Sequence, residues 1–127
     1  MANQFTAGVQ HIGIPTNDMN STIGFYKTLG FEIVHEAAAD CRVVFLKLDN
    51  LVIEAYENHQ AVMKNGAVDH IALDTTDIDA AYAFAKKSGL KLTGGGGIES
   101  LPFWSRGVKF FKVEGPNCET IEFCQIL

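Results

Sequence analysis

The sequence predicts an α+β fold built from two tandem βαβββ modules, and three observations carry this prediction. First, residues 9–33 and 68–92 align without a gap at a constant offset of 59, and eight of the 25 aligned positions are identical. Second, hydrophobic periodicity gives each copy the same order of strand and helix patterns. Third, the last strands of the two halves share the pair Ile-Glu, at Ile53-Glu54 and Ile121-Glu122. Internal repeats of this kind fix the architecture of a chain.

Each copy opens with a short apolar strand, expected at 9–14 and 68–73. A helix-capping pair follows, Asn17-Asp18 in the first copy and Thr76-Asp77 in the second. The next residues are spaced as an amphipathic helix. The expected buried faces are Met19, Ile23, Tyr26 and Leu29 in copy one, and Ile78, Ala81, Tyr82 and Ala85 in copy two. Gly30 and Gly89 stand where a helix ends in the left-handed conformation.

Three strands complete each module, the first of them starting at Phe31 or Leu90. In the first half, strands 42–48 and 51–56 flank the turn pair Asp49-Asn50. In the second half, strands 107–114 and 118–125 flank the turn Gly115-Pro116-Asn117. The second half is nine residues longer before its third strand, because the Ile-Glu pairs are offset by 68 instead of 59. We expect an inserted loop there, at Gly94–Gly97.

Length and composition predict one soluble domain. The 127 residues are one domain's length, with module one at about 8–56 and module two at about 68–126. A net charge of −5 without any basic run argues against a nucleic-acid partner. No apolar run approaches the roughly 20 residues that span a bilayer, so no membrane partner is expected. The first residues do not resemble a secretory signal and the three cysteines are an odd number, which together favour a cytoplasmic location with reduced thiols.

Four polar residues interrupt apolar strands at matching places in the two modules: His11, Glu54, His70 and Glu122. One interpretation is that each is an isolated polar group in the core or at its rim. However, a buried carboxylate is costly unless it is paired or binds a metal. A pseudo-twofold relation between the modules would bring all four side chains to one centre. Two histidines and two glutamates suit Zn²⁺, Ni²⁺, Co²⁺, Mn²⁺ or Fe²⁺, so the sequence predicts one shared divalent metal ion.

The fragments HIGI, GFYKTLGFE, VDHIAL and EGPNCETIEF together resemble the vicinal oxygen chelate superfamily, which includes glyoxalase I, bleomycin resistance proteins and extradiol dioxygenases. The resemblance extends from about Val9 to Gln125. It implies that the two modules form a cupped, eight-stranded mixed sheet. It also implies that His11, Glu54, His70 and Glu122 are the metal ligands, and that the protein is a homodimer acting on a small-molecule substrate.

The complete His-Glu-His-Glu set is most similar to that of glyoxalase I. This implies a metal-dependent lyase or isomerase that acts through an enediolate on a hemithioacetal-type α-hydroxycarbonyl, with Glu122 as the catalytic base and Glu54 as ligand and catalytic partner. Two alternatives stay open. One is another metalloenzyme of the superfamily: an epimerase, a thiol transferase or a dioxygenase. The other is a non-enzymatic protein that binds a small ligand or confers resistance to it.

Substrate contacts are expected at Asn58, Trp104 and Arg106. Asn58 matches an asparagine that binds the glutathione peptide in glyoxalase I, whereas Pro15 stands where those enzymes have an arginine. Trp104 and Arg106 belong to an aromatic loop that could be a lid over the substrate or a plug at the edge of the sheet. We expect His35 and His59, which have no counterpart in the repeat, at the surface. Cys124 shares the strand face of Glu122, but it has no histidine partner that would make it a nucleophile.

Overall fold

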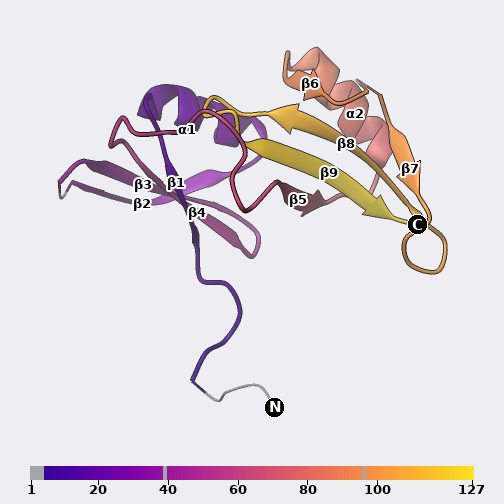
Figure 1. Ribbon diagram of the computed structural model, residues 1–127, viewed down its shortest axis with the longest axis horizontal. Coiled ribbons are helices and arrows are strands. Elements are labelled where there is room, and N and C mark those ends of the chain that lie inside the picture. Colours follow the sequence, from indigo (N-terminus) through magenta and orange to yellow (C-terminus); the bar gives the residue numbers. More distant parts are fainter. Residues whose placement is uncertain (1–4, 39, 96) are drawn as a thin grey trace. The chain divides into compact units, whose positions relative to one another are not determined.

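The computed structural model describes residues 5–38, 40–95 and 97–127, and it divides the chain into two compact units, residues 1–61 and 62–127 (Figure 1). The first unit consists of β1 (Ile12–Pro15), α1 (Met19–Thr28), β2 (Glu32–Ala38), β3 (Arg42–Leu48) and β4 (Leu51–Tyr56). The second consists of β5 (Ile71–Asp74), α2 (Ile78–Lys87), β6 (Lys91–Thr93), β7 (Glu99–Leu101), β8 (Val108–Glu114) and β9 (Thr120–Ile126). The predicted α+β fold with two βαβββ modules is confirmed.

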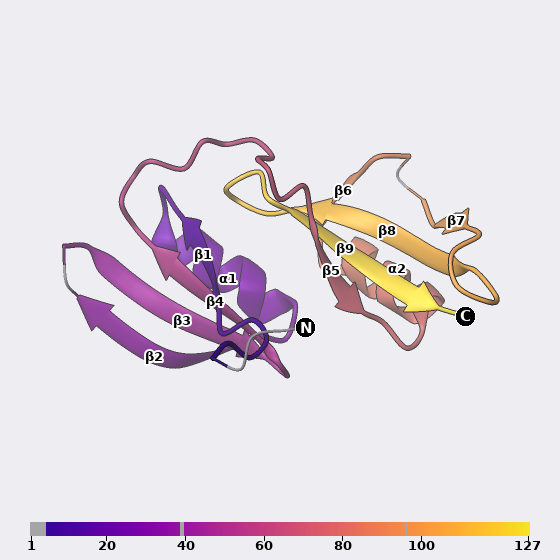
Figure 2. The same ribbon diagram turned by 60° about the horizontal axis from the view of Figure 1, so that its bottom comes forward.

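The first unit is a four-stranded sheet in the order β1-β4-β3-β2, with α1 against one face (Figure 2). Strand β1 is parallel to β4, and the other neighbours are antiparallel. The core lies between helix and sheet. Met19 and Tyr26 on the helix are fully buried, as are four strand side chains: Val44, Leu46, Ile53 and Ala55. Side chains alternate along a strand, so the residues between these point to the other face, which we call the open face of the sheet.

The second unit repeats this arrangement in the order β5-β9-β8-β6, and α2 covers one face. Strand β5 is parallel to β9, just as β1 is parallel to β4. Ile78 and Ala85 on the helix are buried, and so are Phe111, Val113 and Ile121 on the strands. Neither of these ten-residue helices is long enough to cross a membrane, and no other helix is found in the described part of the chain.

Helix ends are set as the repeat predicts. The side chains of Asp18 and Asp77 accept hydrogen bonds from the backbone N–H of Ser21 and Ala80, at 3.2 and 3.1 Å. Each aspartate therefore caps its helix. Gly30 and Gly89 follow the helices with φ of +103° and +71°, a conformation that side chains with a Cβ rarely adopt.

The second sheet contains one strand that the sequence did not predict. Strand β7 lies in the insertion that we expected to form a loop, and it pairs with β8 through Glu99–Phe110, Ser100–Lys109 and Leu101–Val108. The physical reason is the length of β8. Strand β6 covers only the part of β8 from Lys112 to Glu114, which leaves the edge of β8 near Val108 open for another strand. Part of the predicted glycine loop, Gly96, lies outside the described residues.

Candidate functional site: a histidine–glutamate pair in each unit

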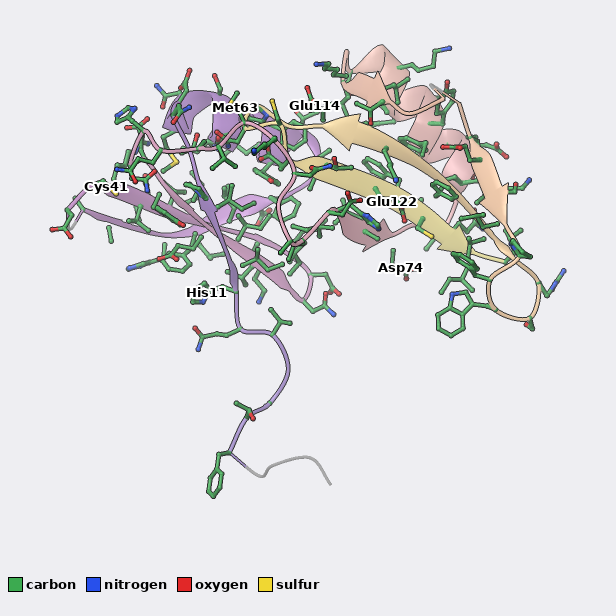
Figure 3. The ribbon with its side chains drawn as sticks, viewed as in Figure 1. His11, Cys41, Met63, Asp74, Glu114 and Glu122 are labelled. Carbon is green, nitrogen blue, oxygen red and sulfur yellow. The ribbon has the colours of Figure 1, made fainter. Side chains whose placement is uncertain are left out.

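In the first unit, the structure brings His11 and Glu54 together. Gly13 pairs with Glu54 in the parallel β1–β4 register, so His11, two residues earlier, lies beside the same part of β4. The distance from His11 Nε2 to Glu54 Oε1 is 3.6 Å. Figure 3 shows His11 where the N-terminal segment leads into β1. The strand itself begins at Ile12, one residue after the histidine, and not at residue 9 as expected.

In the second unit, His70 and Glu122 form the equivalent pair. Ala72 pairs with Glu122 in the parallel β5–β9 register, and His70 Nε2 lies 3.7 Å from Glu122 Oε1. Here too the strand begins directly after the histidine, at Ile71. Two separations that agree within 0.1 Å in non-identical modules indicate that the repeat preserves this pairing.

The two glutamates lie on the open faces of their sheets. Ile53 and Ala55, on either side of Glu54, are buried beneath α1, so Glu54 points away from the helix. The Glu54 side chain is 30% exposed and that of Glu122 is 12% exposed, while the side chains of both histidines are slightly more than one-third exposed. The four side chains are therefore partly accessible to a ligand within each unit.

Space beside Glu54 depends on the absence of a side chain at Gly13. A Cβ built on Gly13 would lie 3.3 Å from the Tyr56 ring and 3.6 Å from Glu54 Oε1. The first of these contacts is closer than ordinary van der Waals packing. Gly13 therefore lets the Tyr56 ring and the Glu54 carboxylate lie close to β1, next to the histidine.

The donor set of each pair suits a divalent cation. The separations of 3.6 and 3.7 Å are too long for good hydrogen bonds. They can be bridged by one ion with two ligand bonds of about 2.1 Å, the length typical of zinc bound to imidazole and carboxylate. Within either unit, the described residues contain no cluster of three or more His, Cys, Asp or Glu side chains that could hold a metal. Each unit thus offers a metal ion two donor groups, one histidine Nε2 and one glutamate carboxylate.

The residue directly before each histidine forms a hydrogen bond with Nδ1, the ring nitrogen that faces away from the glutamate. Gln10 Oε1 lies 2.9 Å from His11 Nδ1, and Asp69 Oδ2 lies 2.9 Å from His70 Nδ1. The hydrogen bond with His70 lowers the pKa of Asp69, so this carboxylate is ionised at neutral pH. Gln10 and Asp69 are not recognisable as partners of the histidines from the sequence, because adjacent residues of a strand normally point to opposite faces.

His35 is a second residue whose position the sequence did not reveal. It is exposed, as expected, but it lies on the open face that carries Glu54. The cause is a β-bulge at Val34: Ile33 pairs with Leu46, whereas His35 pairs with the next residue back, Phe45. Without the extra residue, alternation would place His35 on the same face as Ile33. The Phe45 ring centroid lies 5.8 Å from those of both His11 and His35.

Cys124 lies on the open face of the second sheet, two residues from Glu122. Burial and the neighbouring Glu122 carboxylate both raise the pKa of the Cys124 thiol. A raised pKa keeps the thiol protonated, and a protonated thiol is a poor nucleophile. This agrees with the expectation that Cys124 has no nucleophilic role.

The predicted substrate residues lie outside the strands that carry the histidine–glutamate pairs, Asn58 after the end of β4 and the other two before β8. Asn58 uses its amide oxygen within a turn, where it accepts a hydrogen bond from the Gln60 backbone N–H at 3.0 Å. Trp104 and Arg106 are exposed in the loop between β7 and β8, and both line an open pocket of about 540 Å³.

This pocket also involves Val108, at the start of β8, which pairs with Ile126 at the end of β9. Glu122 is four residues earlier on β9, or about 13 Å along the strand. Within this unit, Trp104 and Arg106 could therefore reach only a distal part of a ligand held at Glu122.

Known proteins resemble this chain over most of its length. The sequence model of the Glyoxalase/Bleomycin resistance protein/Dioxygenase superfamily matches residues 8–117. The uncharacterized protein YwbC of Bacillus subtilis (strain 168) is 31% identical over 125 residues, which cover 92% of this chain and 96% of that protein.

Solved structures share the fold. A glyoxalase family protein from Enterococcus faecalis has a TM-score of 0.78 at 21% identity, covering 95% of this chain and 99% of its own. The fosfomycin resistance protein FosX from Listeria monocytogenes, in complex with Mn(II) and sulfate, has a TM-score of 0.75 at 15% identity, covering 97% of this chain and 95% of its own.

Proposed function

Because this chain belongs to the Glyoxalase/Bleomycin resistance protein/Dioxygenase superfamily, we propose that it is a metal-dependent lyase or isomerase of the glyoxalase I type. Its substrate would be a small α-hydroxycarbonyl of the hemithioacetal kind. The observation that carries the proposal is the repeated histidine–glutamate pair, at 3.6 Å in one unit and 3.7 Å in the other.

His11, Glu54, His70 and Glu122 would together hold one divalent ion, chosen from Ni²⁺, Zn²⁺, Co²⁺, Mn²⁺ and Fe²⁺. Two imidazole nitrogens and two carboxylate oxygens are donors that all of these ions accept. The structure of FosX from Listeria monocytogenes in complex with Mn(II) supports a metal-binding role for this fold. A bound divalent ion would act as a Lewis acid toward two vicinal oxygens of the substrate.

Glu122 is the general base of the proposed reaction. Its carboxylate takes a proton from one substrate carbon and returns it to the neighbouring carbon, so the substrate isomerises without net oxidation or loss of atoms. The Glu122 side chain is 12% exposed, so little bulk water reaches the carboxylate where it would meet the substrate. Glu54, which is 30% exposed, is proposed as a ligand that assists from the first module.

Space for the reacting part of the substrate is suggested by the residues beside the histidines. Gly13 and Ala72 are the smallest residue types, and they pair with Glu54 and Glu122 respectively. A larger side chain at either position would occupy the volume next to the carboxylate. Beside Gly13 the Tyr56 ring takes up part of this room, so the small residues favour a ligand-binding role chiefly for the open face of the second unit, beside Ala72.

The decisive experiment measures metal content and catalysis on the same sample. The purified full-length protein is reconstituted with each candidate ion, dialysed, and analysed for bound metal by elemental analysis. It is then assayed with hemithioacetals formed from methylglyoxal and a panel of low-molecular-weight thiols. We expect about one ion per chain and isomerisation of at least one adduct. Failure to bind any divalent ion after reconstitution would overturn the proposal and favour a ligand-binding protein without catalysis.

A further inference from the structure

Each candidate ligand histidine has its second ring nitrogen engaged by the residue directly before it. His11 Nδ1 is 2.9 Å from the side-chain oxygen of Gln10, and His70 Nδ1 is 2.9 Å from a carboxylate oxygen of Asp69. Both contacts occur where the chain has not yet entered its strand, because β1 begins at Ile12 and β5 at Ile71. Outside the pleat, adjacent side chains are free to turn toward each other.

The chemistry of these partners fixes which nitrogen carries the proton. An amide oxygen and a carboxylate oxygen can only accept a hydrogen bond, so Nδ1 of each histidine must donate. In a neutral imidazole the other nitrogen, Nε2, then keeps its lone pair. Nε2 is the atom that faces Glu54 in the first unit and Glu122 in the second. The structure thus points two lone pairs, one from nitrogen and one from oxygen, at the same small volume in each unit.

The partner of His70, Asp69, is itself held in place by a further hydrogen bond, whereas among the residues that the structure describes no further side-chain hydrogen bond supports Gln10, the partner of His11. Asn65 Nδ2 donates to Asp69 Oδ1 at 3.4 Å, and Thr120 Oγ1 donates to Asn65 Oδ1 at 3.1 Å. Thr120 lies two residues before Glu122 on β9, on the same face. The second unit therefore contains a chain of side chains that leads from β9 through Asn65 and Asp69 to His70 and back to Glu122.

We propose that Gln10 and Asp69 are positioning residues that select the Nδ1–H tautomer of His11 and His70 and present Nε2 to the metal, and that the histidine–glutamate pair of the second unit binds a metal more strongly than that of the first. The metal part of this inference rests on the proposed function, but the tautomer part does not. The asymmetry follows from chemistry at equal distance: a carboxylate accepts a charge-assisted hydrogen bond, which is about twice as strong as that to an amide. A hydrogen bond from Nδ1–H to a carboxylate also makes the imidazole a better electron donor to a metal at Nε2.

The first test reads the tautomers directly in the metal-free, full-length protein. Long-range ¹H–¹⁵N NMR spectra, recorded above the pH at which histidine titrates, distinguish the two tautomers of each ring. We expect the Nδ1–H form for His11 and His70 in the wild type. Asp69→Ala should move His70 alone toward the Nε2–H form, and Gln10→Ala should move His11 alone. Signals of His35 and His59 are the internal controls.

The second test measures affinity for Co²⁺ or Zn²⁺ by competition with a chromophoric chelator. Asp69→Ala should weaken binding by about 10–100-fold, the range typical of lost outer-shell partners. Asp69→Asn keeps an acceptor without the charge, so it should preserve the tautomer and lose less affinity. Gln10→Ala should cost less than Asp69→Ala. Because Asp69 and Gln10 are exposed, all three variants should keep the wild-type circular dichroism spectrum.

The positioning role of Gln10 and Asp69 and the proposed metal function can be refuted by different results. If His70 is in the Nε2–H form in the wild type, or if Asp69→Ala leaves its tautomer unchanged, the inference is overturned whatever the metal does. If the tautomers are as expected but no ion binds, the proposed metal function fails and the positioning of the rings stands. If the wild type and Asp69→Ala bind Co²⁺ equally well, the role of Asp69 toward the metal is refuted while the metal site remains.

Discussion

Glu57 accepts a hydrogen bond from the backbone N–H of Met19 at 2.6 Å, which ties the start of α1 to the end of β4. The second unit has the same connection: Gln125 Oε1 accepts from the backbone N–H of Ile78 at 2.8 Å. Glu57 and Gln125 each follow the candidate glutamate of their strand by three residues. The first N–H groups of a helix have no partner within the helix, so a side chain from the neighbouring strand satisfies one of them.

This connection predicts a stability effect in the first unit. Glu57→Ala should lower the free energy of unfolding by about 1 kcal/mol, because it leaves the Met19 N–H without its acceptor. Glu57→Gln should be close to the wild type, since the amide of Gln125 performs the same task in the second unit. Urea denaturation followed by circular dichroism measures both. Equal unfolding free energies for Glu57→Ala and the wild type would mean that this hydrogen bond contributes nothing net.

Asp18 should contribute to the loss of folding stability at low pH. Hydrogen bonds from the Ser21 hydroxyl and from the Ser21 backbone N–H hold the pKa of Asp18 below its ordinary value of 3.8. Because the folded-state pKa lies below the unfolded one, the stabilisation is complete above the unfolded value and is lost as the pH falls through the folded value. Ser21→Ala removes the larger cause, so the Asp18 pKa should rise toward 3.8 in an NMR titration. An unchanged Asp18 pKa in that variant would contradict the assignment of its cause.

The repeat made much of this fold predictable from sequence. The sequence predicts a cap within each of the pairs Asn17-Asp18 and Thr76-Asp77, and helix ends at Gly30 and Gly89, because short-range chemistry decides such positions. Pairing partners were harder to predict. Strand β7 forms because β6 leaves part of β8 uncovered, and the bulge at Val34 turns His35 toward the open face. Both depend on register between strands far apart in sequence, which no local pattern reveals.

Of the candidate site, only the four proposed metal ligands are predictable from the sequence. His11, Glu54, His70 and Glu122 could be found because they are polar residues repeated within apolar segments. Their supports could not be found in this way. Gln10 and Asp69 differ in chemistry, and Glu57 and Gln125 are aligned only at the offset of the last strands, so neither pair appears among the eight identities of the repeat.

The two candidate carboxylates should differ in their contributions to activity. Glu122→Gln should abolish isomerisation, because an amide cannot accept the proton at neutral pH. Glu54→Gln should be milder, since an amide oxygen remains a weak ligand. Turnover of the best hemithioacetal substrate measures both, with Glu36→Gln as a control at an exposed position on β2. Full activity in Glu122→Gln would transfer the role of base to another residue.

Removing a ligand histidine should lower metal affinity more than removing the charge of a ligand glutamate. His11→Ala and His70→Ala each delete a whole ligand, so the bound metal should fall well below that of Glu54→Gln. In the wild type, metal should raise the melting temperature, because it binds the folded chain better than the unfolded one. Differential scanning fluorimetry with and without chelator measures this shift. His59→Ala, at an exposed turn, is the matched control, and a chelator that leaves every melting temperature unchanged would rule out a stabilising metal.

Glutathione is predicted to be a poor thiol component of the substrate. Pro15 occupies the position at which glyoxalase I enzymes have an arginine for the glutathione carboxylate, and the arginines of this chain do not offer a replacement within their own units. Arg42 binds Asn20 of α1 through Nη1 at 3.1 Å, which places its guanidinium on the helix-covered side of the first sheet, whereas Glu54 is on the open face. Arg106 lies in the loop before β8, remote from Glu122 along β9.

A charge-assisted hydrogen bond is worth about 1.5–3 kcal/mol, so its loss should weaken the binding of the glutathione adduct about tenfold or more. We therefore expect weak or no turnover of the glutathione–methylglyoxal hemithioacetal. Pro15→Arg should increase kcat/KM for this adduct and leave kcat/KM unchanged for the adduct of an uncharged thiol such as 2-mercaptoethanol. Pro15→Gln is the matched control, because it removes the proline without adding a positive charge. Efficient turnover of the glutathione adduct by the wild type would show that another group binds the carboxylate.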